Sequence, residues 1–437
     1  MKERSKSLLI KNGHVIDPAS KIDAEMDIIL RDGKVAEVGR KGKLRGSADE
    51  KFDARGLIVA PGFIDMHVHL REPGQSHKET IASGTRAAAA GGFTSVCAMP
   101  NTAPVNDSAE ITTWMRAPER GAIVNVFPIA AATIGSMGEK LTDFRALQRA
   151  GAVALTDDGK PILEDTIMRE VLRQAAQFGL PVIQHAEDTR LTSGAVMNAG
   201  PTAFRLGLRG MPDEAEAVIV ERDIKLAAQT KSQLHVAHIS TAAALKAVRK
   251  AKHDRLRVSC EITPHHFTLI DEDVAAENSL SMYDSRFKMN PPLRSAADRE
   301  AMLGALTDGA IDAIATDHAP HSAQEKNAEF DRAPFGIIGL ETALGLVITR
   351  LHRDKRIPLT RIVELFSTNP ARLLNLRGRG SLAAGSFADI TIFDPDKRWI
   401  YDAEGSLSLS KNSPFGGWQL RGKVMATIVS GSIVFPG

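Results

Sequence analysis

The strongest constraint on the fold is a repeated alternation, through the middle of the chain, between short apolar runs and longer helical stretches. Eight apolar or β-branched runs occur, at residues 63–67, 94–99, 123–130, 152–155, 181–185, 234–238, 257–262 and 311–316. Helical patterns lie between them, and Gly179 and Gly309 stand where helices should end. This alternation is typical of βα units with a parallel sheet. Eight units predict an α/β fold, a (β/α)8 TIM barrel.

The two ends of the chain have a different pattern, in which apolar and polar residues alternate between turn signals. Residues 7–60 include an Asp32-Gly33 hairpin signal, and residues 388–393 and 424–435 repeat the pattern. Neither end has enough strands for a sheet of its own, so we expect both ends to build one small composite β-sandwich. The predicted division is 1–60 for its first part, 61–376 for the barrel and 377–437 for its second part.

Composition narrows the class of function. A net charge of +2, without basic runs interleaved with aromatics, argues against a nucleic-acid partner. No run of about 18 apolar residues occurs, so we expect neither a membrane span nor export. Cys97 and Cys260 each lie in an apolar run, which suits buried thiols of a reducing compartment. We therefore expect a cytoplasmic protein that acts on small molecules.

Metal-binding residue types gather at the ends of the predicted strands, where a barrel places its active site. His67 and His69 lie two residues apart and so share one strand face. The other strand ends supply one of the adjacent pair Asp157 and Asp158, and also His185, His238 and Asp317. Four histidines and two carboxylates exceed the ligands of one tetrahedral zinc ion, so we expect two ions. A pair of ions that shares a hydroxide nucleophile suits hydrolysis or its reverse.

Motifs in a fixed order now identify a resemblance. They are His67-Val-His69-Leu-Arg71-Glu-Pro-Gly74, Met99-Pro-Asn101-Thr, Thr156-Asp-Asp-Gly159, His185-Ala-Glu, His238-Ile-Ser-Thr, Met289-Asn290-Pro-Pro-Leu-Arg294, Asp317-His-Ala-Pro-His321 and Pro334-Phe-Gly336. With them the chain resembles, over nearly its whole length, the type I dihydroorotases of the amidohydrolase superfamily. That family interconverts N-carbamoyl-L-aspartate and (S)-dihydroorotate, a step of pyrimidine synthesis.

The resemblance also implies roles for individual residues. It implies that His67, His69 and Asp317 bind one Zn²⁺, that His185 and His238 bind the other, and that Asp158 binds both. It implies a substrate pocket made by His69, Arg71, Asn101, Asn290, His321, Phe335 and Gly336. Asp317 is the expected catalytic acid and base, and Arg71 the expected partner of the substrate carboxylate. Hydantoinases bridge their metals with a carboxylated lysine, so Asp157 and the nearby Lys160 stay open as alternatives to Asp158.

Several alternatives remain at this point. The chain could be another cyclic amidase, such as a hydantoinase, dihydropyrimidinase or allantoinase, or a non-catalytic subunit of an aspartate transcarbamoylase complex. We expect a homodimer, and association with aspartate transcarbamoylase stays open. Among other histidines, His265 and His266 are expected to make structural hydrogen bonds. His235 is expected to pack between the barrel and its helices.

Overall fold

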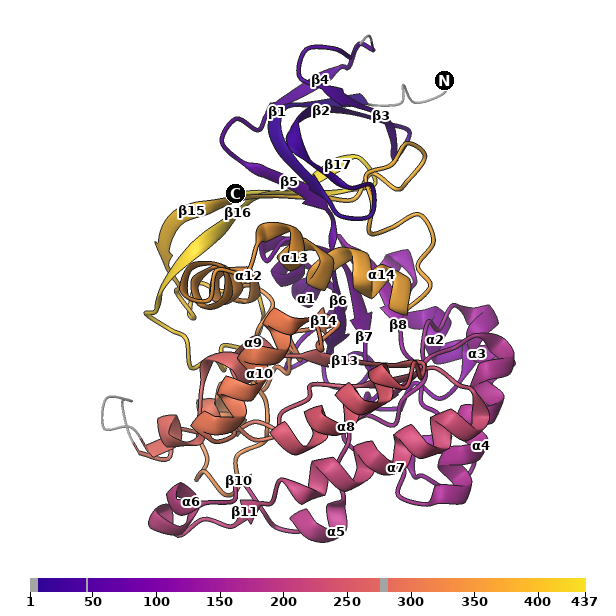
Figure 1. The fold of residues 1–437 in the computed structure, drawn as a ribbon, viewed down its shortest axis with the longest axis vertical. Coiled ribbons are helices and arrows are strands. Elements are labelled where there is room, and N and C mark those ends of the chain that lie inside the picture. The colour runs from indigo at the N-terminus through magenta and orange to yellow at the C-terminus, as the bar shows by residue number, and fades with distance from the viewer. Residues whose placement is uncertain (1–6, 45, 276–281) are drawn as a thin grey trace.

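The computed structural model describes residues 7–44, 46–275 and 282–437. A twisted sheet occupies one end of the molecule, and a body of parallel strands surrounded by helices forms the rest (Figure 1). Helices α12 (Ala343–Val347), α13 (Leu359–Val363) and α14 (Asn369–Leu373) lie between the two in this view, and α12 and α13 contact strands of the sheet.

Strands from both chain ends form the sheet. In the order of their hydrogen-bonded neighbours they are β17 (Ser432–Pro436), β16 (Gln419–Val429), β15 (Ile390–Ile400), β5 (Ile58–Pro61), β1 (Ser7–Asp17), β2 (Ile22–Arg31) and β3 (Lys34–Arg40), and β4 (Glu50–Asp53) also pairs with β1. The turn between β2 and β3 places Asp32 (φ 53°) and Gly33 (φ 70°) in the left-handed region, as the hairpin signal requires. Alternating side chains such as Ile10, Ile28 and Ile390 form its buried core.

The parallel strands pair in two ladders. One contains β6 (Phe63–Val68), β7 (Phe93–Ala98) and β8 (Asn125–Pro128), and the other contains β9 (Val182–Gln184), β12 (Leu234–Val236), β13 (Val258–Ile262) and β14 (Ala313–Ile314). Isolated bridges join the ladders, because Leu155 pairs with both Ala130 and Val182, and Val68 pairs with His318. The pairing therefore runs round a closed circuit. The strand predicted at 152–155 is wrong as a full strand, since only these bridges at Leu155 represent it. The short pair β10 (Met197–Asn198) and β11 (Gly210–Met211) lies outside the circuit.

Helices follow most of these strands. The remaining ones are α1 (Ile81–Ala90), α2 (Ala109–Met115), α3 (Phe144–Ala150), α4 (Asp165–Phe178), α5 (Thr189–Thr192), α6 (Pro201–Leu206), α7 (Glu214–Thr230), α8 (Ala242–His253), α9 (Pro264–Thr268), α10 (Ala296–Asp308) and α11 (Ala323–Lys326). In α4 the buried residues Met168, Val171, Leu172 and Ala175 recur at helical spacing and face the strands. Gly179 and Gly309 end α4 and α10 with left-handed backbones, as predicted.

Two further expectations can be compared with the structure. Cys97 and Cys260 are both buried and free, as their apolar surroundings predicted. In the described ranges, none of the helices has the length and apolar character needed to cross a membrane. The division into 1–60, 61–376 and 377–437 stays a prediction, although β5 ends at Pro61 and β6 begins at Phe63.

Candidate metal centre and substrate pocket

The six predicted metal ligands converge at one end of the circuit of strands. His67 lies in β6 and His69 just after it, while Asp158, His185, His238 and Asp317 follow Leu155, β9, β12 and β14. All six side chains are buried. Their ligand atoms form three overlapping groups in which all atoms lie within 4.8 Å of one another, namely His67, His69 and Asp158; His67, His238 and Asp317; and Asp158, His185 and His238.

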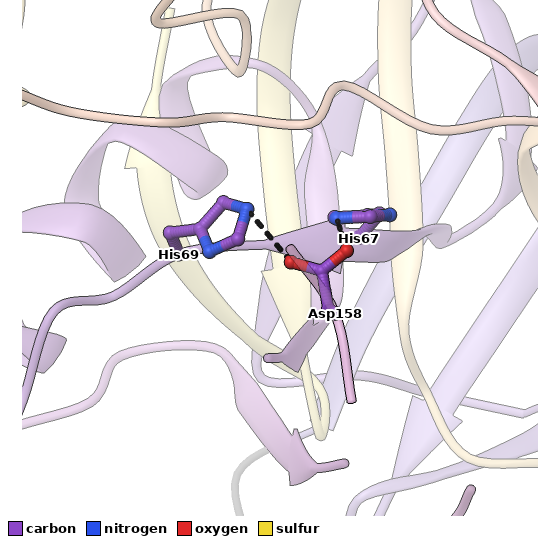
Figure 2. Close-up of side chains that lie close together, drawn as sticks. All are labelled: His67, His69 and Asp158. Atoms are coloured by element: carbon purple, nitrogen blue, oxygen red, sulfur yellow. Dashed lines mark ion pairs between the residues drawn. The ribbon is translucent and has the colours of Figure 1, made fainter. Parts of the chain in front are cut away.

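The carboxylate of Asp158 lies between two of the imidazole rings (Figure 2). Its Oδ1 is 3.5 Å from His67 Nε2, and its Oδ2 is 3.7 Å from His69 Nε2. The same Oδ1 is 3.8 Å from His185 Nδ1 and 3.9 Å from His238 Nε2. Asp158 is the member shared by the first and third groups, and its two carboxylate oxygens, unlike the rings of His67 and His238 that the other pairs of groups share, suit a bridging ligand.

Asp317 completes the cluster on the side of β6. Its Oδ1 is 3.5 Å from His67 Nε2 and 3.1 Å from His69 Nε2. Burial raises the pKa of Asp317, but the adjacent imidazole rings of His67 and His69 lower it more, so the net pKa lies below its usual range. The carboxylate thus stays ionised, as a metal ligand must be.

The donor set fits bound metal ions. Nε2 of His67 is buried and has no hydrogen-bond partner among the described residues. Nδ1 of His185 and Nε2 of His238 face each other at 3.1 Å. A crowded set of imidazole and carboxylate ligand atoms, with Nε2 of His67 left unpartnered, suits zinc-like ions, which prefer these ligands.

Two side chains next to the ligands fix the orientation of their rings. His69 Nδ1 donates to Asn101 Oδ1 (2.8 Å), and Asn101 Nδ2 donates to Asp158 Oδ2 (3.0 Å). His185 Nε2 donates to Glu187 Oε2 (3.0 Å), which also accepts from Asn290 Nδ2 (2.9 Å). Each contact leaves the opposite ring nitrogen free for a metal. Glu187 ends the motif His185-Ala-Glu, but the sequence analysis gave it no role.

A cavity of about 220 Å³ adjoins five of the six predicted ligands, all except His67. It is lined by six of the predicted substrate-binding residues, namely His69, Arg71, Asn101, Asn290, His321 and Phe335. Gly336, the seventh, is not among the residues that line it. A Cβ at Gly336 would lie 2.5 Å from the carbonyl oxygen of Ala319, so the close approach of the two backbones requires glycine.

Arg71 is a buried cation on the wall of this cavity. Its Nε donates to Pro320 O (3.0 Å) and its Nη2 donates to His321 Nε2 (3.2 Å). Burial lowers the pKa of Arg71 only to about 10, so the guanidinium stays charged at neutral pH. In the part of the chain that the structure describes, no carboxylate lies within 4.0 Å of this guanidinium. Asp317 and Asp158 act on the Arg71 charge only from a greater distance, so a buried cation without a contacting counterion suits an anionic ligand in this cavity.

The C-terminal part of the chain supports the same wall. Asn412 Nδ2 donates to Ala319 O (2.9 Å) and Gly336 O (3.0 Å), and Asn412 Oδ1 accepts from His321 N (3.1 Å). Lys326 Nζ adds a bond to Gly336 O (3.1 Å). Asn412 is thus fully hydrogen-bonded to the two segments that hold His321 and Phe335.

The remaining candidates lie elsewhere. Asp157 binds Thr133 through the backbone N–H (3.0 Å) and the hydroxyl, which indicates a loop-supporting role, and Lys160 is exposed. His266 makes the expected structural hydrogen bonds, to Thr263 Oγ1 and Pro291 O. The same expectation is wrong for His265, because its buried Nε2 has no hydrogen-bond partner among the described residues. The expectation for His235 is wrong. Its ring faces the polar side chains of β13, because the alternation of β12 turns Leu234 and Val236, and not His235, toward the helices.

Comparison with known proteins distinguishes between the related activities. A family model described as Dihydro-orotase-like matches residues 56–244. A dihydroorotase of Solibacter usitatus (strain Ellin6076) is 51% identical over 98% of this chain and 97% of its own length. The chain belongs to the dihydroorotase family. A second member, from Geobacter sp. (strain M21), is 48% identical over 98% of this chain and 99% of its own length.

Solved structures of other enzymes have the same fold as this chain. An L-hydantoinase (dihydropyrimidinase) from Arthrobacter aurescens matches with a TM-score of 0.87 at 25% identity, over 99% of this chain and 96% of that one. A dihydropyrimidinase from Brevibacillus agri NCHU1002 matches with a TM-score of 0.83 at 23% identity, over 98% and 95%. Dihydroorotase family members therefore share this fold with hydantoinases, while the sequence of this chain is much closer to the dihydroorotases.

Proposed function

We propose that this protein is a dihydroorotase, which interconverts N-carbamoyl-L-aspartate and (S)-dihydroorotate plus water. The observation that carries this proposal is the unpaired, buried guanidinium of Arg71 beside the metal cluster. Dihydroorotate has a ring carboxylate that can pair with a planar guanidinium. Hydantoin and dihydrouracil lack this group and would leave the charge of Arg71 buried without a partner.

The fold assignment follows from the closed circuit of parallel pairings. We infer that the circuit is a (β/α)8 barrel and that the sheet from both chain ends is the composite β-sandwich expected from the sequence. The positions of the six ligands support the barrel, because catalytic residues of such barrels follow the C-terminal ends of different strands. The high TM-scores of the hydantoinase structures are consistent with it.

Two zinc ions are proposed for the cluster. His67, His69 and Asp317 would hold one ion, His185 and His238 the other, and Asp158 both. Bound zinc supplies polarisation of the ring carbonyl and an activated water nucleophile. The six donors and the unpartnered Nε2 of His67 support this assignment.

The side chains themselves divide the remaining work. Arg71 binds the substrate carboxylate and so fixes which ring carbonyl faces the cluster. In hydrolysis the amide C–N bond breaks, a water oxygen joins the carbonyl carbon, and Asp317 transfers a water proton to the departing nitrogen. In ring closure the same carboxylate removes that proton from the ureido nitrogen. The burial of Asp317 keeps this proton transfer away from bulk water.

The test combines metal removal with activity in both directions. Chelator-treated protein should neither hydrolyse dihydroorotate nor cyclise carbamoyl aspartate, and zinc should restore both activities. Full activity in protein shown by elemental analysis to be metal-free would contradict the proposal. A homodimer, association with aspartate transcarbamoylase, and a cytoplasmic location stay predictions.

A further inference from the structure

A buried carboxylate inside the circuit of strands has no role in the site described so far. Glu261 lies in β13 and is 1% exposed. The core cluster between the strands and the helices includes Val258, Cys260 and Ile262 of this strand. Side chains alternate along a strand, so Glu261 faces the opposite side, toward the inside of the circuit. A carboxylate at such a depth requires partners for both of its oxygens.

Its two oxygens face two imidazole rings. Oε1 is 3.1 Å from His67 Nδ1, and Oε2 is 3.2 Å from His235 Nε2. The other nitrogen of His235, Nδ1, lies 2.8 Å from the hydroxyl of Ser259. A carboxylate only accepts hydrogen bonds, so His67 donates from Nδ1 to Oε1 of Glu261. Oε2 of Glu261 and Nε2 of His235 lie close together without a hydrogen bond.

This arrangement determines what His67 offers on its other side. With its proton on Nδ1, the neutral ring presents the lone pair of Nε2, which lies 3.5 Å from both Asp158 Oδ1 and Asp317 Oδ1. The opposite tautomer would present an N–H there and could not bind a cation. We propose that Glu261 is a positioning residue that fixes the tautomer and orientation of His67 for metal binding. The proposal rests on the metal centre of the proposed function, and it adds a residue outside the ligand set.

A second buried carboxylate provides a matched control. Asp65 is 0% exposed and also contacts His67, but its Oδ1 accepts from the backbone N–H of His67 (3.1 Å) and of Thr316 (3.1 Å). It therefore joins two strands and leaves the imidazole ring alone. Asp65→Asn and Glu261→Gln both exchange a buried carboxylate for an amide of similar shape, and only the second changes the partner of the ring.

The experiment measures zinc binding by the metal-free protein in competition with a chromophoric chelator. Glu261→Gln should weaken binding of at least one zinc ion by about 10- to 100-fold, the usual effect of removing a group that orients a metal ligand. Asp65→Asn should leave both dissociation constants close to those of the wild type. Thermal unfolding of the metal-free proteins separates this effect from a structural one, because a purely structural role would lower Tm without changing zinc affinity.

Two results would overturn the proposal. One is a Glu261→Gln protein that binds both zinc ions as tightly as the wild type. The other comes from the wild type alone and is independent of how the variant folds. In zinc-loaded protein labelled with ¹⁵N in its imidazole rings, His67 should carry its proton on Nδ1, and a proton-free Nδ1 would refute the role of Glu261. A wild type that binds no zinc would instead refute the metal centre itself, so the two failures are distinguishable.

Discussion

Replacement of Arg71 by methionine tests the carboxylate pocket. Methionine keeps much of the buried volume but removes the charge and the bonds to Pro320 O and His321 Nε2. Loss of one partner from a desolvated charge pair costs about 2 to 5 kcal/mol. At about 1.4 kcal/mol per factor of ten, kcat/KM for dihydroorotate should fall by about 30-fold to about 5,000-fold.

The assay follows ring opening of dihydroorotate and ring closure of carbamoyl aspartate, with zinc content measured on the same samples. The values of kcat/KM for ring opening and for ring closure should both fall. The zinc content should stay at the wild-type value, because Arg71 is not among the ligand groups. Lys78→Met is the control, since Lys78 is already paired with Glu325 at 2.9 Å, and it should change kcat/KM by less than about fivefold. Kinetic constants of Arg71→Met close to those of the wild type would refute the assignment of Arg71.

Three further changes test other parts of the molecule. Asp317→Asn should lower kcat/KM in both directions by about 10²- to 10⁴-fold, because one group moves the proton in ring opening and in ring closure; a variant that keeps the wild-type kcat/KM would contradict this role. Asn412→Ala should raise KM and lower the free energy of unfolding by about 1 to 3 kcal/mol, because it leaves Ala319 O and Gly336 O without their amide donor; an unchanged KM would contradict its effect on the pocket. Burial raises the pKa of Asp223 to about 7, and Arg222 offsets this only in part. The folded state therefore binds a proton there between about pH 4 and 7, so this contribution to the free energy of unfolding is complete at low pH and is lost as pH rises through about 7. Urea titrations should show that Asp223→Asn flattens this decline by up to about 1.4 kcal/mol per pH unit, and an unchanged slope would contradict the raised pKa.

The ends of the apolar runs located five of the six clustered side chains, because such runs end at the same face of a barrel. They left Asp157 and Asp158 as alternatives, and the resemblance to dihydroorotases selected Asp158. The sequence also indicated that both chain ends enter one sheet. Glu261 and Asn412 were missed for a physical reason. Their partners lie 194 residues away at His67 and 91 residues away at His321, and no local pattern records contacts of that length.

At residues 152–155 the sequence predicted more regular structure than the chain has. These apolar residues predicted a full strand, yet only Leu155 forms bridges to its neighbours, because the chain turns at once into the loop that holds Asp157 and Asp158. The side chains of β12 alternate between two faces, and the prediction placed His235 on the face toward the helices, where Leu234 and Val236 lie instead. The sequence of β13 could have indicated the correct face of His235. Ser259 and Glu261 alternate there with apolar residues and so form a polar face beside β12.

The central claim is that the pocket selects a cyclic amide with a ring carboxylate. The most direct measurement compares kcat/KM of the zinc-loaded wild type for (S)-dihydroorotate and for 5,6-dihydrouracil, which differ only in that carboxylate. Dihydroorotate should be preferred by at least about 30-fold, the lower limit set by one desolvated charge pair. Equal or better turnover of dihydrouracil would contradict the account and would favour a dihydropyrimidinase.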